Sequence, residues 1–129
     1  LAYSQDQITL NGWAMECRIN AEDPDNDFRP QPGRVGNYLA PGGPGVRVDS
    51  CVYPNYNIPP YYDSMVAKLI VWGKNRNEVI SRMKRALGEF QVGNIATTIP
   101  FHLRVLDNAF FVKGEVYTNF IQRRMQDLS

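Results

Sequence analysis

Two arginines and one aspartate are the side chains of this chain best suited to chemistry on an anion. Arg18 lies in a strand-like segment, Arg47 follows a glycine-rich turn, and Asp63 follows a pair of tyrosines. A guanidinium presents a planar fork of N–H donors that can hold an oxyanion or stabilise negative charge as it develops. A carboxylate can orient such a fork. Because most Arg–Asp pairs are structural ion pairs, the pattern leaves both interpretations open.

Other catalytic side chains are sparse. His102 is the single histidine and lies beside Phe101 and Leu103, which favours a structural role over a general base. Two cysteines, Cys17 and Cys51, are too few for a disulfide framework and favour a reducing, cytoplasmic setting. No ligand pair has zinc spacing, so we expect no metal site. The paired carboxylates of one proline-rich loop favour a solvated turn over acid–base catalysis, because no apolar neighbours would raise their pKa. They are Glu22, Asp23, Asp25 and Asp27.

Two loops have residue types found in ligand-binding loops, but the residues around them argue against binding. Gly42, Gly43 and Gly45 suit a phosphate loop, but a strand-like segment follows them where such a loop needs a helix. Tyrosines interleaved with prolines at 53–62 suit a stacking platform for single-stranded nucleic acid. That segment has no basic residue, and the net charge is only +1. We therefore expect no nucleic-acid partner.

Strands are expected mainly in the first half of the chain, where they must position these side chains. Residues 13–19 alternate, which puts Cys17 and Ile19 on one face and Arg18 on the other. The expected strands are 8–20, with a hairpin turn at Asn11-Gly12, then 35–39, 46–50 and 65–72. Residues 116–120 are expected to form a short strand or an extended piece.

Helices are expected in the second half. Asn75 caps a helix with one apolar stripe and a Glu78–Arg82 pair. A second helix starts near Thr98, with Pro100 in its first turn, and a third covers 121–128. Strands first and helices later predict an α+β fold, with an antiparallel sheet and two to three helices.

Size and composition favour one domain over residues 1–129. The chain is 43% hydrophobic and 21% charged, which is apolar enough to bury a core. It has no run of about 18 apolar residues, so we expect no membrane span. It begins with Leu1 rather than Met, so we expect a piece of a larger protein.

Several long motifs, in order, resemble the C-terminal domain of biotin carboxylase. They lie at 12–24 (GWAMECRINAEDP), 28–33, 41–50, 59–65 (PPYYDSM), 67–70, 82–87 and 97–102. The resemblance covers nearly the whole chain and implies the rudiment-hybrid-motif fold. It also implies that the N-terminal and ATP-grasp domains of the parent enzyme are absent here.

The resemblance implies a ligase activity for the parent protein. Such enzymes use ATP, Mg²⁺ and bicarbonate, through carboxyphosphate, to carboxylate N1 of biotin on a carrier protein. It implies an acetyl-CoA carboxylase of fatty acid biosynthesis, or alternatively a pyruvate or propionyl-CoA carboxylase. The isolated chain is then expected to be inactive and to hold no cofactor. A stand-alone binding module is the alternative from another class.

The resemblance also assigns roles to individual residues. Arg18 matches a catalytic arginine that contacts bicarbonate and the ureido oxygen of biotin, and Asp63 matches an acidic residue lining the biotin side. Phe120 matches an apolar residue near adenine. Arg47 and Pro44 match homodimer-interface positions, although Pro44 stands where Phe is common.

The implied partners are the ATP-grasp domain of the same protein, the biotin carboxyl carrier protein, a carboxyltransferase and a second copy. The implied location is the cytoplasm, or the mitochondrial matrix in a eukaryote.

Overall fold

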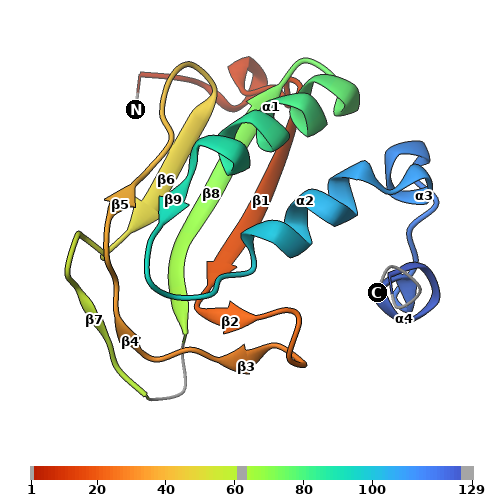
Figure 1. Cartoon of the computed structure of the whole chain (residues 1–129). Helices are drawn as coiled ribbons and strands as arrows, with labels where there is room; N and C mark the ends of the chain where they lie inside the picture. Colours follow the sequence, from red (N-terminus) through yellow and green to blue (C-terminus); the bar gives the residue numbers. More distant parts are fainter. Residues whose placement is uncertain (1, 61–63, 126–129) are drawn as a thin grey trace.

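The computed structural model describes residues 2–60 and 64–125 (Figure 1). Strands fill the first half of the chain and helices the second. The first elements are the 3₁₀ turn η1 (Gln5–Gln7), β1 (Trp13–Asn20), β2 (Glu22–Asp23), β3 (Arg29–Pro30), β4 (Gly33–Arg34), β5 (Tyr38–Leu39), β6 (Val46–Ser50) and β7 (Asn57–Ile58). They are followed by β8 (Met65–Gly73), α1 (Arg76–Glu89), β9 (Gln91–Val92), α2 (Ile99–Asp107), α3 (Ala109–Lys113) and α4 (Phe120–Arg124).

A three-stranded antiparallel sheet in the order β1-β8-β6 forms the frame of the domain. Leu69 in the central strand pairs with Cys17 in β1 and with Val48 in β6. Alternation sends Cys17, Ile19 and Leu69 to one face, where each is buried. The opposite face of the same strands carries polar side chains, Arg18 among them.

Helix α1 covers the apolar face of the sheet and completes the core (Figure 1). Asn75 caps it, since its side chain accepts a hydrogen bond from the Glu78 backbone N–H at 2.9 Å. Val79, Met83 and Leu87 form the buried stripe at helical spacing. The Glu78–Arg82 pair forms as expected, at 3.3 Å. Burial of this stripe against the sheet stabilises the domain.

Helix α2 lies beside β1, and α3 and α4 continue away from the sheet (Figure 1). The Arg76 side chain at the start of α1 donates hydrogen bonds to the carbonyls of Phe111 and Val112, at 2.5 and 2.7 Å. Asn108 caps α3 and also donates to the Arg124 carbonyl at 3.2 Å. These bonds join the two short helices to α1 and to each other.

The segment between β1 and β6 contains only short ladders. Its two-residue strands pair as β2 with β3, β4 with β7 and β5 with β9. The strand expected over 35–39 is reduced to Tyr38–Leu39, while Val35 is fully buried without belonging to a strand. Repeated prolines and glycines prevent longer pairing here.

Three other expectations need correction. The hairpin at Asn11-Gly12 is wrong: β1 begins at Trp13, and residues 8–10 are exposed and form no strand. Residues 116–120, expected as a short strand or an extended piece, form no strand, and Phe120 begins α4. Helix α3 is not among the expected helices, and Gly114, in the left-handed conformation (φ 80°), ends it.

The α+β prediction is confirmed, with a small antiparallel sheet and helices concentrated later in the chain. Within residues 2–60 and 64–125, no helix has the length and apolar character needed to span a bilayer.

Candidate functional site

The polar face of the sheet brings charged side chains from three strands into neighbouring rows. The register pairs Arg18 of β1 with Lys68 of β8, and Lys68 with Asp49 of β6. One row along, Glu16 pairs with Ile70, and Ile70 with Arg47. Arg18 and Arg47 therefore lie on the same face but on opposite edge strands.

The Arg18 guanidinium is weakly held. Its side chain is 67% exposed, and its Nε lies 3.5 Å from Glu16 Oε1. At that distance and exposure the ion pair adds little stability. The donor fork of Arg18 is therefore accessible to an anion arriving at this face.

The backbone of Arg18, in contrast, is firmly anchored to α2. The Arg18 carbonyl accepts a hydrogen bond from Thr98 Oγ1 at 3.1 Å and lies 2.8 Å from His102 Nε2. Thr98 Oγ1 also accepts from the Asn20 N–H at 3.1 Å. The pairing register of β1 shifts between Ile19 and Asn20, one residue beyond Arg18. A shift of this kind often re-aims a neighbouring side chain.

Arg47 shows the opposite arrangement. Its Nε and one terminal nitrogen donate to the two carboxylate oxygens of Asp49, at 3.0 and 3.1 Å. This fork-to-fork contact with Asp49 raises the pKa of the Arg47 guanidinium. Pro44 lies exposed in the turn that precedes β6.

Asp63 lies outside the described residues. Ser64, the next residue, is bound to the chain just beyond β1: the Ala21 N–H donates to the Ser64 carbonyl at 2.7 Å, and Ser64 Oγ donates to Glu22 at 2.9 Å. Ser64 is thus fixed to the segment that follows Asn20.

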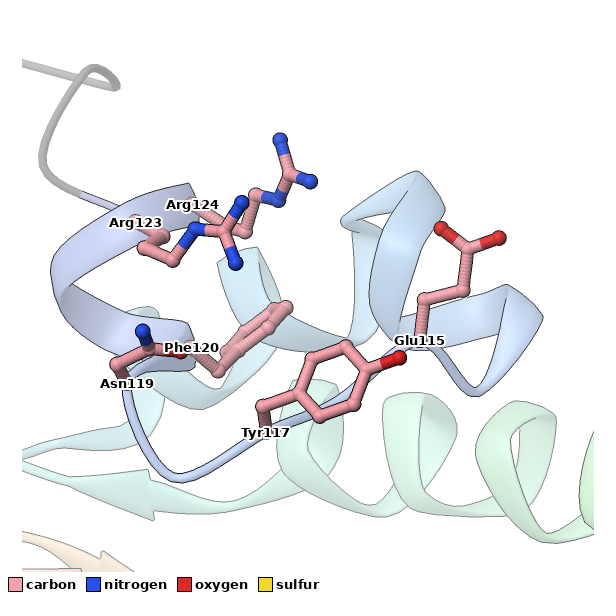
Figure 2. Close-up of a pocket in the computed structure, with 6 residues that line it drawn as sticks. All are labelled: Glu115, Tyr117, Asn119, Phe120, Arg123 and Arg124. Atoms are coloured by element: carbon pink, nitrogen blue, oxygen red, sulfur yellow. The ribbon is translucent and has the colours of Figure 1, made fainter.

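Phe120 belongs to a separate depression at the C-terminal helices (Figure 2). Its ring is buried and lies 6.2 Å from the Phe111 ring. All six residues that line the depression come from one stretch of chain: Glu115, Tyr117, Asn119, Phe120, Arg123 and Arg124. The sheet contributes none of them, so Phe120 and Arg18 do not share this depression.

Among residues 2–60 and 64–125, the cysteines and carboxylates form no second centre. Burial raises the pKa of the Cys17 thiol to about 12, with a smaller contribution from Glu16, so this thiol is a poor nucleophile. Cys51 is exposed. In the part of the chain that the structure describes, no three His, Cys, Asp or Glu side chains gather as metal ligands.

Sequence reasoning missed the contacts of Thr98 and His102 with the Arg18 carbonyl. The sequence identifies Thr98 only as a helix start and His102 only as a structural residue. The contacts join positions 80 and 84 residues apart. No local pattern in the sequence signals them.

Comparison with known proteins gives one consistent family. The family model for the biotin carboxylase C-terminal domain matches residues 16–123. The biotin carboxylase of a Nostoc species is 60% identical over 122 residues, covering 95% of this chain and 27% of that protein. One of the subunits of pyruvate carboxylase from Methanothermobacter thermautotrophicus is 55% identical over 121 residues, covering 94% of this chain and 25% of that protein.

Solved structures agree with the sequence comparison. A biotin carboxylase complex with β-γ-ATP from Campylobacter jejuni matches with a TM-score of 0.90 and 44% identity, over 96% of this chain and 28% of that one. The biotin carboxylase domain dimer of Hydrogenobacter thermophilus 2-oxoglutarate carboxylase, with MgADP, ADP and bicarbonate, matches with a TM-score of 0.89 and 41% identity, over 95% and 27%. The chain thus spans about a quarter of the length of these relatives.

Proposed function

The chain belongs to the biotin carboxylase C-terminal domain family, and we propose that it forms one wall of the active site of an ATP-dependent biotin carboxylase. The longer protein would use ATP and bicarbonate to carboxylate N1 of biotin on a carrier protein. The observation that carries this proposal is Arg18, whose guanidinium is exposed while its backbone is anchored. The Hydrogenobacter thermophilus structure that holds bicarbonate supports the choice of substrate.

Arg18 is the catalytic residue in this proposal. Deprotonation of biotin N1 places negative charge on the ureido oxygen, and the guanidinium stabilises that charge as it develops. A cation fixed beforehand assists most at this point, because the charge is absent from the ground state. The same fork can bind bicarbonate through two parallel N–H donors. Lysine would keep the charge and lose the fork.

Asp63 is the second residue of the proposed biotin side. We propose that its carboxylate orients an arginine guanidinium, because it lies in the PPYYDSM motif at 59–65.

The cofactors ATP and Mg²⁺ belong mainly to other parts of the longer protein in this proposal. The described residues bring no set of carboxylates together for Mg²⁺, so we place the metal and phosphate contacts on an ATP-grasp domain. Phe120 would contribute an apolar contact on the adenine side. Its ring is already packed against Phe111, which suits a wall of a pocket better than a mobile lid.

Partners and assembly follow from the same family. We propose that Arg47 and Pro44 lie at a homodimer interface, and both are exposed here. The Hydrogenobacter thermophilus relative is a dimer in its structure. A biotin carboxyl carrier protein and a carboxyltransferase would complete the system, in the cytoplasm or, in a eukaryote, the mitochondrial matrix.

The final acceptor of the carboxyl group is the finer question. We propose an acetyl-CoA carboxylase of fatty acid biosynthesis on the resemblance of the motifs; the 60% identity to the Nostoc biotin carboxylase supports the biotin carboxylation step itself. A pyruvate or propionyl-CoA carboxylase is the alternative, since the Methanothermobacter thermautotrophicus pyruvate carboxylase protein is 55% identical.

The test uses the full-length protein and ATP-dependent carboxylation of biotin. Arg18→Ala should lower kcat at least about 100-fold, the usual loss when one stabilising donor of an oxyanion is removed. Arg85→Ala, on the solvated face of α1, is the matched control and should leave the rate unchanged. An unchanged rate in Arg18→Ala would remove Arg18 from its proposed role. The 129-residue chain alone should show no bicarbonate-dependent ATPase activity.

A further inference from the structure

The start of α2 completes the hydrogen bonding of β1 in place of a neighbouring strand. Thr98 makes a reciprocal pair with Asn20: the Thr98 N–H donates to the Asn20 carbonyl, and the Asn20 N–H donates to Thr98 Oγ1, both at 3.1 Å. The Thr98 hydroxyl proton goes to the Arg18 carbonyl, also at 3.1 Å. One buried threonine thus satisfies three polar groups on the free edge of an edge strand.

His102 reaches the same carbonyl from one helical turn further on. Residues 98 and 102 lie on one side of α2, because positions four apart are neighbours on a helix. His102 Nε2 lies 2.8 Å from the Arg18 carbonyl oxygen. A carbonyl oxygen only accepts hydrogen bonds, so Nε2 carries the proton. Two side chains of one helix therefore converge on a single peptide group.

The anchored peptide is that of Arg18, whose own side chain is 67% exposed. We propose that Thr98 and His102 are positioning residues that fix the Arg18 peptide and thereby aim its guanidinium. This inference rests on the proposed catalytic role of Arg18. The fold fixes the base of the side chain through its backbone and leaves the donor fork free for a ligand.

The physical reason is the sensitivity of catalysis to placement. A misplacement of about 1 Å can cost about 100-fold in rate. The register of β1 shifts directly after Ile19, so β8 alone does not hold the end of the strand in regular pairing. The two bonds from α2 supply the missing restraint on the side of β1 that faces away from β8.

A purely structural role would use the same bonds only to dock α2 on the sheet. The two roles predict different effects on the rate when Arg18 is also replaced. If the bonds only dock α2, their loss lowers stability, and its effect on the rate is the same whether or not Arg18 is present. If they position Arg18, their effect on the rate vanishes once Arg18 itself is replaced.

The experiment measures kcat and KM for biotin carboxylation in the full-length protein. Thr98→Val removes the hydroxyl, and Thr98→Ser keeps it. His102→Leu removes the ring donor, and His102→Gln keeps an N–H at a similar reach. Thr97→Val is the matched control, because Thr97 is also buried but its hydroxyl accepts only a long, 3.4 Å bond from Ile99 within the same turn.

Thr98→Val and His102→Leu should each lower kcat about 10-fold, with KM for ATP unchanged. Thr98→Ser and His102→Gln should recover most of the rate, and Thr97→Val should behave like the parent. In an Arg18→Lys background, Thr98→Val and His102→Leu should cause no further loss, as a double-mutant cycle reveals for coupled residues.

Equal losses in Thr98→Val and Thr97→Val would overturn the inference, and so would a full additional loss in the Arg18→Lys background. If Thr98→Val does not fold, the half-exposed His102 decides the question by the same comparisons. Failure of the proposed function is distinguishable, because Arg18→Lys would then carboxylate biotin at the parent rate.

Discussion

The two edge strands of the sheet, β1 and β6, each carry an exposed arginine on the same face and hold it in opposite ways. Arg18 is fixed through its carbonyl, by Thr98 and His102, while among the described residues its guanidinium meets only Glu16, at 3.5 Å. Arg47 is fixed through its guanidinium, which forks onto Asp49. Exposure is similar, 67% against 73%. Accessibility alone therefore does not mark a binding arginine: the state of its donor fork does.

Both edges depend on β8, so a cavity there should weaken them together. Leu69→Ala removes a fully buried side chain that lies between Cys17 and Val48. We expect a loss of about 2–5 kcal/mol in the free energy of unfolding, measured by urea denaturation of the 129-residue chain. Ile70→Ala, on the polar face of the same strand, should cost less. Equal effects would show that α1 does not form the core against β8.

The β1 edge alone should respond to Thr98→Val. This change leaves the Asn20 N–H without its acceptor and should cost about 1–3 kcal/mol. Amide hydrogen exchange should speed up at Asn20 and remain unchanged along β6. Faster exchange along both edges would contradict a local anchor.

Cys17 lies on the buried face of β1, and Cys51 lies exposed just after β6. The contribution of Cys17 to stability should depend on pH. The Cys17 pKa of about 12 lies above its ordinary value of 9.0. Between these pH values the unfolded chain loses the proton that the folded chain keeps, so stability falls as pH rises. The stability advantage of wild type over Cys17→Ala should shrink by about 1 kcal/mol between pH 8 and 10.

Exposed Cys51 provides a reference for the accessibility of the Cys17 thiol. Thiol reagents should label Cys51 first and Cys17 only on unfolding. Early labelling of Cys17 would mean that the β1 face opens in the folded protein.

The smallest effect is expected at Arg47. Asp49→Asn breaks a surface pair, and such pairs add little because water screens them. The urea midpoint should not change measurably. A clear fall would show that the pair anchors β6 as firmly as α2 anchors β1.

Local patterns were sufficient to predict the frame of the fold. Alternation identified β6, a continuous apolar run identified β8, and the Asn75 cap with its apolar stripe identified α1. These features succeed because each pattern reflects burial of one face of one element. The α+β class follows from their order alone.

Prediction failed where short segments rely on distant partners. Residues 116–120 suggested a short strand or an extended piece, but Phe120 packs on Phe111, and the segment leads into α4. Residues 8–10 have a hairpin signal at Asn11-Gly12, yet they pack against no apolar surface and remain exposed. Periodicity over so few residues does not show which surface will cover them.

The candidate site also has one part that the sequence predicts and one that it does not. Arg18 was identifiable from its residue type, its strand face and its motif. The contacts of Thr98 and His102 were not, because they depend on how α2 meets β1 in three dimensions. The anchor of a functional side chain is thus less visible in a sequence than the side chain itself.

The most direct test of the difference between the two arginines compares Arg18→Lys with Arg47→Lys in the full-length protein, under identical conditions, by the rate of biotin carboxylation. Both variants keep the charge and lose only the planar fork. We predict a loss of at least about 100-fold for Arg18→Lys and less than about 3-fold for Arg47→Lys. Equal losses, or a larger loss at Arg47, would contradict the assignment of the free fork to the β1 edge.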